Sequence, residues 1–142
     1  MTRIDFYILK NQLDQGLALL TCRLVEKAYQ KGHYVYIHTT DQQQSQQIDD
    51  LLWCFKESSF IPHCQLTEND EQAQVMIGHN HEPPLEFDVL VNLADRVPLF
   101  FSRFTRVAEI VDGDENRKQQ ARERFRFYRD RGYPLNSHDI TL

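Results

Sequence analysis

The segment FDVLVNL, residues 87–93, is apolar at all but two positions. A strand with one face in water alternates apolar and polar side chains, whereas a strand covered on both faces is apolar nearly throughout. Such a strand lies inside a sheet that carries helices on both sides. The segment therefore predicts an α/β protein with a mostly parallel sheet.

The rest of the chain alternates short apolar segments with longer amphipathic ones. Further strands are predicted at residues 4–9, 34–37, 75–77 and 107–111, and a short helix at residues 99–106. Because strands and helices alternate, we expect a mostly parallel sheet covered on both faces. The length and composition predict a single domain over residues 1–142.

Two amphipathic segments predict the helices between the early strands. One face of the first carries apolar residues at helical spacing, namely Leu17, Leu20, Leu24 and Ala28. Gly32 ends this helix, and Asp41 is placed to cap the next one. One face of the second helix carries Ile48, Leu51, Leu52 and Phe55. Trp53 lies off that face, so we expect it to point outward or into a joint.

The composition indicates a soluble protein with a substantial core. The chain has 142 residues, of which 41% are apolar, and no apolar run approaches the roughly 20 residues that cross a bilayer. Its N-terminus lacks the pattern of a signal peptide. Cys22, Cys54 and Cys64 are odd in number and widely spaced, which argues against a disulfide framework. These features predict a cytoplasmic protein that has no membrane contact.

The segment DENRKQQARERFRFYRDR, residues 114–131, has the start and stop signals of a helix. Asp114 is placed to cap its first amides, and Gly132 to end it. At about 100° per residue, an apolar stripe lies beside a row of basic side chains. The stripe consists of Ala121, Phe125 and Tyr128, and the row of Lys118, Arg122, Arg126 and Arg129.

This helix is also the most basic part of the chain. It contains seven basic residues, Arg124 among them, and four acidic ones, so its formal charge is +3; the whole chain carries −5, which leaves −8 for the rest. Guanidinium groups beside an aromatic stripe suit a ligand that is both anionic and apolar. The alternative is a solvated face, since basic residues near the end of a helix also favour its dipole.

The sequence lacks the motifs of common α/β enzymes. The first strand-to-helix connection, KNQLDQG at residues 10–16, has one glycine, so it matches neither a dinucleotide fingerprint nor a phosphate-binding loop. Asp41 resembles a ribose-binding acid, but helix capping explains it. His79 and His81, even with the donors at residues 63–64, are too few for a metal site, and no nucleophile motif is present. We therefore expect a binding protein with no cofactor, no metal and no catalytic residue.

Several segments resemble the chi subunit of bacterial DNA polymerase III, an accessory of the clamp-loader complex. They are FYIL at residues 6–9, LLW at 51–53, SFIPH at 59–63 and KQQARERFRFYR at 118–129, followed by Gly132, Leu135 and Asn136. Together they extend over nearly all of the chain. The resemblance implies a Rossmann-like α/β fold without a nucleotide-binding loop. It also implies a non-catalytic role in DNA replication.

The resemblance implies two protein partners, the psi subunit and the acidic C-terminal tail of single-stranded-DNA-binding protein. The positions that match those linked to the tail are Val111, Lys118, Arg122, Phe125 and Arg126. Arg122 would clamp the terminal carboxylate, while Lys118 and Arg126 would meet acidic side chains. Phe125 and Val111 would wall an apolar pocket. Phe125 stands where tyrosine is common, which removes one hydrogen bond worth about 1 kcal/mol, and Arg126 where lysine is common.

For psi, the matching positions are Trp53, Phe60 and Pro62. The position of Trp53 off the apolar face agrees with this role, because aromatic side chains are the usual anchors of interfaces. The alternative is that Trp53 folds back under the loop at residues 58–63. Members of the family are also reported to engage a repair helicase through this face, which makes such a helicase a further candidate partner.

Two other functions compete with that of a protein-binding adaptor. The basic helix would also suit direct binding of single-stranded nucleic acid, since guanidinium and aromatic groups match phosphates and bases. An enzyme that uses the α/β crevice is the other alternative. The net charge of −5 and the confinement of basic residues to one stripe favour the adaptor, whose contact with DNA is indirect.

Overall fold

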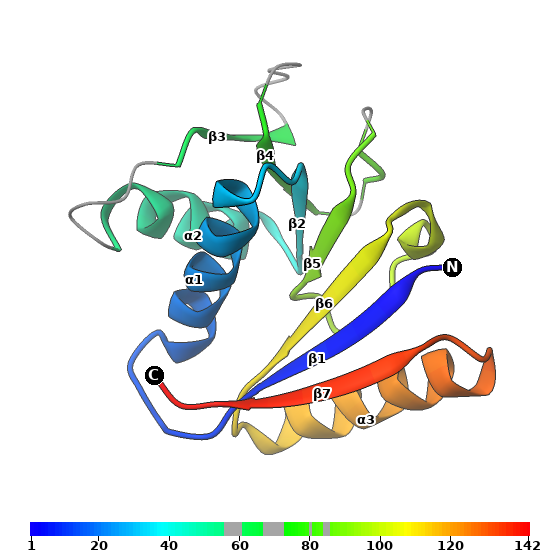
Figure 1. The fold of residues 1–142 in the computed structure, drawn as a ribbon. Helices are drawn as coiled ribbons and strands as arrows, with labels where there is room; N and C mark the ends of the chain where they lie inside the picture. The colour runs from blue at the N-terminus through cyan, green and yellow to red at the C-terminus, as the bar shows by residue number, and fades with distance from the viewer. Residues whose placement is uncertain (56–60, 67–72, 80, 84–85) are drawn as a thin grey trace.

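The computed structural model describes residues 1–55, 61–66, 73–79, 81–83 and 86–142. Its centre is a seven-stranded sheet in which every pairing is parallel, with the order β3-β4-β2-β5-β6-β1-β7 (Figure 1). The strands are β1 (Arg3–Leu9), β2 (Val35–Thr39), β3 (His63–Gln65), β4 (Val75–His79), β5 (Val89–Asn92), β6 (Arg106–Val111) and β7 (Leu135–Ile140). The helices are α1 (Gly16–Gln30), α2 (Gln42–Cys54) and α3 (Glu115–Asp130), with a short 3₁₀ helix, η2 (Phe101–Arg103).

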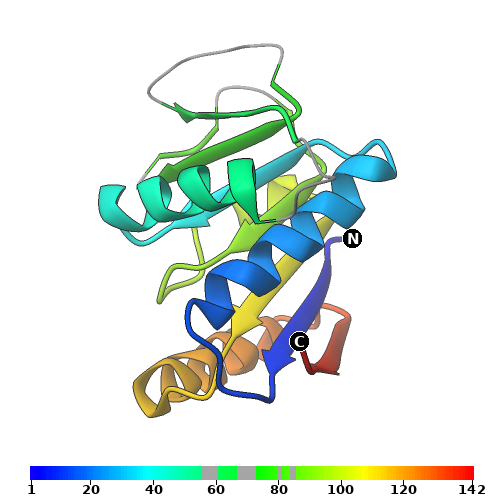
Figure 2. The same ribbon diagram turned by 90° about the vertical axis from the view of Figure 1, so that its left-hand side faces the viewer.

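Helices cover both faces of the sheet, as predicted. Helices α1 and α2 lie on one face and α3 on the other (Figures 1 and 2). The core is accordingly divided into two apolar clusters. One lies under α1 and α2 and includes Val25, Ile37, Leu52, Ile77 and Val91; the other lies under α3 and includes Phe6, Leu90, Val107, Ala121 and Tyr128. All four residues of β5 are buried, which confirms the interpretation of FDVLVNL as a strand covered on both faces.

The predicted helix caps are confirmed. The Asp41 carboxylate accepts a hydrogen bond from the Gln44 amide at 2.9 Å, and the Asp114 carboxylate accepts one from the Arg117 amide at 3.0 Å. Gly132 follows α3 with φ of 78°, a left-handed conformation that glycine adopts without strain. Asp41 is thus accounted for by its position at the start of α2.

Two predictions within the helical segments need correction. In α1 the predicted face is confirmed in part: Leu20 is 2% exposed, and Leu17, Leu24 and Ala28 are half-buried and pack against the same core cluster. The buried side chains also include Ala18, Cys22 and Val25, so the buried arc is wider than the predicted stripe. The helix predicted at residues 99–106 is only the three-residue η2, and Arg106 already belongs to β6.

Both edge strands are missing from the sequence prediction. A loop is predicted through His63, and no strand after residue 111, yet β3 begins at His63 and β7 follows α3. Strand β3 has three residues, and β7 has the largely polar sequence LNSHDI. Strand β3 is too short to show a pattern, although its three residues are buried, and β7 is partly exposed, so neither has the apolar pattern that marks central strands. Pairing with β4 and β1, respectively, defines them instead.

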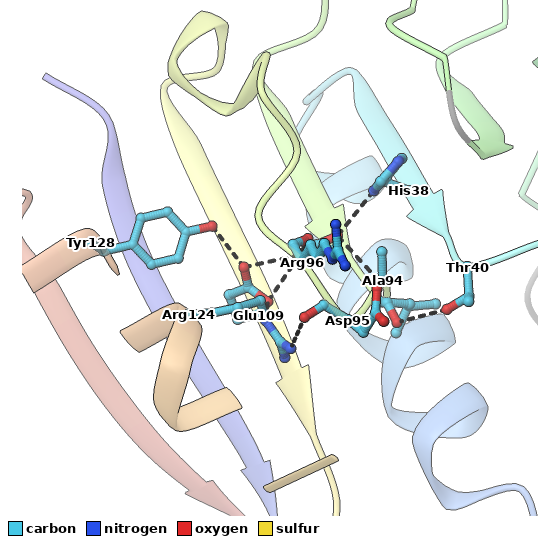
Figure 3. A network of polar contacts seen from close by, with 10 residues as sticks. His38, Thr40, Ala94, Asp95, Arg96, Glu109, Arg124 and Tyr128 are labelled. Carbon is cyan, nitrogen blue, oxygen red and sulfur yellow. Dashed lines mark hydrogen bonds and ion pairs between the residues drawn. The ribbon is translucent and has the colours of Figure 1, made fainter. Parts of the chain in front are cut away.

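A buried carboxylate on β6 holds α3 against the sheet (Figure 3). Glu109 is 0% exposed and accepts hydrogen bonds from Arg124 Nε at 2.8 Å and from the Tyr128 hydroxyl at 2.7 Å. Asn92 Nδ2 donates to the same carboxylate at 3.0 and 3.1 Å. Burial, together with the neighbouring Glu109 charge, raises the pKa of Tyr128, so its hydroxyl remains protonated and donates. These contacts fix the rotation of α3 about its axis.

The network continues across the sheet to β2. The Asn92 side-chain oxygen lies 3.1 Å from His38 Nδ1 and accepts a hydrogen bond from the Ala94 amide at 3.2 Å. Burial lowers the pKa of His38, which favours a neutral ring that donates from Nδ1. Arg124 also donates to the backbone oxygen of Asp95 at 3.1 Å (Figure 3). The loop after β5 is therefore tied to both β2 and α3.

A second buried carboxylate joins three strands at the other face. Asp5 on β1 is 1% exposed and contacts Arg3 Nε at 3.3 Å, Arg106 Nη2 at 3.1 Å and His138 Nε2 at 3.0 Å. Burial by itself raises the pKa of Asp5. The hydrogen bonds from His138 and Arg106 and the charge of Arg3 outweigh that effect, so the pKa lies below its ordinary value. Asp5 thereby links β1 to β6 and β7.

Replacing Glu109 by glutamine is expected to lower the free energy of unfolding by about 3–5 kcal/mol, because it leaves the buried Arg124 without a counter-charge. Urea unfolding followed by circular dichroism measures this loss. Glu115→Gln, which removes the same charge from an exposed position on α3, is the matched control and should change stability by less than about 0.5 kcal/mol. Equal effects of the two changes would contradict a structural role for Glu109.

The stabilising effect of Asp5 is expected to depend on pH in one direction. Since its pKa is lowered in the folded state, its contribution is present above the unfolded pKa of about 3.9 and is lost as the pH falls through the folded value. The stability difference between the wild type and Asp5→Asn should thus be constant from pH 6 to 5 and shrink below pH 4. Urea midpoints at each pH measure it, with the exposed Asp14→Asn as control. A difference that grows on acidification would exclude this account.

Candidate functional site

The outer face of α3 is determined by which of its side chains reach the sheet. Arg124 and Tyr128 point inward to Glu109, so the flank that carries Lys118, Arg122 and Phe125, spaced at i, i+4 and i+7, lies at the margin of the buried face. Arg122 is exposed, and Lys118 and Phe125 are half-buried. Arg126 follows one turn after Arg122 and is exposed. We call this set, with Val111, the α3 face.

The α3 face has an apolar base. The Phe125 ring packs against Phe6 with ring centroids 5.4 Å apart and an interplanar angle of 59°. Val111, at the end of β6, belongs to the same apolar cluster but is only 5% exposed. The four sequence-predicted residues of α3 therefore lie on one flank of the helix, where the half-buried Phe125 supplies apolar surface. Val111 is buried in the apolar cluster under α3.

Most basic side chains of the α3 segment are already paired. Arg117 donates two hydrogen bonds to the Asp112 carboxylate at 2.8 and 2.7 Å. Weaker pairs join Lys118 to Glu115 at 3.8 Å and Arg129 to Asp130 at 3.2 Å. Arg131 lies over the Phe127 ring, 3.6 Å from its centroid, on the opposite flank. Among the described residues, Arg122 and Arg126 have no acidic partner, so both guanidinium groups remain available to an anion.

Arg124 does not add to the exposed positive charge of α3, although the count made from sequence includes it. It appears there as one of seven basic residues of the helix, but its side chain is 7% exposed and paired with Glu109. The available signal was positional: at about 100° per residue, Arg124 lies about 40° from Tyr128 on the helical wheel, beside the apolar stripe and away from the basic row. A second signal was the acid within the apolar sequence RVAEIV of β6, because this residue, Glu109, is the partner of Arg124.

A second candidate face lies at the other end of the sheet, on α2. Trp53 is 48% exposed, which confirms that it points outward, and its ring lies 4.1 Å from that of His63. His63 is held by the Ile61 backbone oxygen at 2.6 Å and by Asp49 Oδ1 at 3.0 Å. Pro62 is exposed just before β3. We call Trp53 and Pro62 the α2 face; Phe60 lies outside the described residues, as do residues 58 and 59 of the loop.

The start of α1 differs from a nucleotide-binding loop. Gln15, the residue before it, has a left-handed backbone with φ of 55° and provides no side-chain cap. A Cβ atom at Gly16 would lie 2.7 Å from Leu9 Cδ2, so packing against β1 accounts for the glycine.

The described residues contain no group of three or more metal-ligating side chains, and His79 and His81 therefore remain outside any such cluster. The His81 backbone oxygen instead accepts a hydrogen bond from the Tyr36 hydroxyl at 2.8 Å. No helix in the described part of the chain is both long and apolar enough to cross a membrane.

Comparison with known proteins gives a consistent family assignment. Residues 1–136 match the family model described as DNA polymerase III chi subunit, HolC. The chain is 42% identical over 140 residues to the DNA polymerase III subunit chi of Pseudomonas aeruginosa, which covers 99% of this chain and 98% of that protein. The proteins of the same name from Escherichia coli and Haemophilus influenzae are 31% and 28% identical, and each alignment covers 96% of this chain and 97% and 96%, respectively, of the relative. The chain therefore belongs to the family of the DNA polymerase III chi subunit.

Proposed function

We propose that this protein is a non-catalytic accessory subunit in DNA replication that binds the psi subunit and the acidic tail of single-stranded-DNA-binding protein. Membership of the chi family supports the replication role. The observation that carries the tail assignment is that Arg122 and Arg126, beside the half-buried Phe125, have no acidic partner in the described part of the chain; Arg122 donates only to the neutral Gln119 side chain, at 3.3 Å.

The α3 face has the chemistry that an acidic peptide with an apolar C-terminal residue requires. Arg122 would bind the terminal carboxylate through paired N–H donors, a geometry that a guanidinium offers and an ammonium does not. Arg126 and Lys118 would attract the preceding acidic side chains. Phe125 would contact the last apolar side chain. Because the Arg124 side chain is paired with Glu109, Arg124 would position the helix without touching the peptide.

The α2 face suits a partner that buries an aromatic anchor. Trp53 exposes about half of its surface while His63 supports its ring, so docking would bury a large side chain that is already oriented. This face and the α3 face lie on opposite sides of the sheet (Figure 1). Two partners could consequently bind together, as an adaptor requires. A repair helicase that used the α2 face would compete with psi.

Direct binding of single-stranded DNA is the alternative function of the same helix. It would need a continuous basic track along the backbone. The ion pairs of Arg117 and Arg129 interrupt such a track, so the adaptor function is favoured.

The tail assignment predicts that Arg122→Ala weakens binding of a peptide copying the tail by about 2 kcal/mol, the scale of a lost charge-assisted clamp. Isothermal titration calorimetry measures the change. Arg129→Ala is the matched control, because it removes an exposed arginine of the same helix that already pairs with Asp130. Binding should also weaken as salt concentration rises.

Three outcomes would reject this assignment. They are the absence of peptide binding by the wild type, equal effects of the Arg122 and Arg129 changes, and tighter binding of a bare single-stranded oligonucleotide than of the peptide at moderate salt. The last outcome would establish the alternative function.

The psi assignment predicts that Trp53→Ala weakens association with the psi subunit by about 2 kcal/mol or more, as loss of an interface anchor does. Surface plasmon resonance with immobilised psi measures it. Tyr34→Ala is the control, since Tyr34 is 50% exposed, close to the 48% of Trp53, and its ring packs against Phe87 on the other face of the sheet. If the two variants bind psi equally well, the interface lies elsewhere.

A further inference from the structure

A groove on the α1 side of the sheet is not used by either proposed partner. It lies between the C-terminal half of α1 and strands β1, β6 and β7, and has a volume of about 350 Å³. Peptide and ligand pockets of proteins start at roughly this size. The floor is apolar and is formed by Leu24, Ala28, Val91, Ala108 and Ile140.

The rim of the groove is basic. Lys27 lies in the last turn of α1, Lys31 is the residue that caps its C-terminal end, and Arg106 comes from the start of β6. Both lysines are exposed, and in the described part of the chain neither forms an ion pair. Arg106 is 43% exposed at its side chain and has one nitrogen, Nη2, on Asp5 at 3.1 Å. In a protein of net charge −5, this is a second local concentration of cations.

Asp5 does not neutralise this rim. Its side chain is 1% exposed and already accepts hydrogen bonds from Arg3, Arg106 and His138, so its negative charge is buried and paired with these side chains. The same contacts make one wall rigid. The ring of His138, held by Asp5, is stacked on Tyr7 with centroids 4.8 Å apart and an angle of 18°. The groove is therefore preformed, which reduces the entropic cost of binding.

We propose that this groove binds an acidic peptide segment, which inserts one apolar side chain between α1 and β1 and places its carboxylates on Lys27, Lys31 and Arg106. The Cβ atoms of residues one helical turn apart are about 5–6 Å apart, and alternate residues of an extended peptide are about 6.6 Å apart. Two carboxylates of one peptide can thus reach both ammonium groups. The site is independent of the α3 face, which lies across the sheet.

Two features favour a peptide over a nucleic acid. The floor is aliphatic, so it matches an aliphatic or aromatic side chain in the way that protein interfaces do. Base stacking needs an open aromatic face. The aromatic side chain of the groove, Tyr7, already has His138 stacked against it.

The test uses the ¹⁵N-labelled full chain and the peptide acetyl-Asp-Glu-Phe-Asp-Glu-amide. Its blocked C-terminus removes the free carboxylate that the α3 face is proposed to clamp. We expect saturable shifts of the amide signals of Lys27, Ala28, Ala108 and His138. Lys27→Gln/Lys31→Gln should weaken this binding roughly threefold to tenfold through loss of two exposed charge pairs. Lys10→Gln/Arg23→Gln, with the same net charge, should leave it unchanged.

The proposal is overturned if the groove signals do not shift, if both double variants weaken binding equally, or if a single-stranded oligonucleotide shifts them and the peptide does not. Its failure is separable from that of the proposed function. Arg122→Ala should leave the groove titration unchanged, and a tail peptide with a free carboxylate should shift the signals of α3 in Lys27→Gln/Lys31→Gln as in the wild type.

Discussion

The buried carboxylate of Glu109 is the contact on which the orientation of α3 depends. Removing such a charge from water costs several kcal/mol unless charged and polar donors surround it. Here Arg124 and Tyr128 supply donors from α3, and Asn92 supplies them from β5. Once two positions of a helix are directed inward, helix geometry fixes the direction of all the others. The exposure of Arg122 therefore follows from the burial of Arg124.

The two faces of the sheet are organised in the same way. Each contains one buried acid on a central strand, Glu109 under α3 and Asp5 on the α1 side, and each acid binds an arginine from a different segment. The negative charges of both acids are therefore paired inside the protein. Several exposed basic side chains that have no ion pair among the described residues lie near one another, on α3 and at the end of α1, although the chain as a whole is acidic. Local cation clusters of this kind attract acidic partners without making the whole surface attractive to nucleic acid.

Central elements could be predicted from sequence, and edge elements could not. The strand at β5, the caps Asp41 and Asp114, and the outward position of Trp53 all rest on local patterns of burial and hydrogen bonding. Strands β3 and β7 are defined by pairing with partners far along the chain, and their own residues carry little signal. The groove beside α1 could not be predicted from sequence either, because it is formed by α1, β1, β6 and β7, which are separated in sequence.

The sequence by itself determined the alternation of strands and helices, the helix ends and the basic, aromatic character of α3. Each of these depends on interactions within a few residues. The tertiary structure decided which basic side chains are available, since the ion pair that buries Arg124 against Glu109 is made across the fold. Residue type determines the charge of a side chain, but only its three-dimensional neighbours determine whether that charge is paired inside the protein or accessible to a partner.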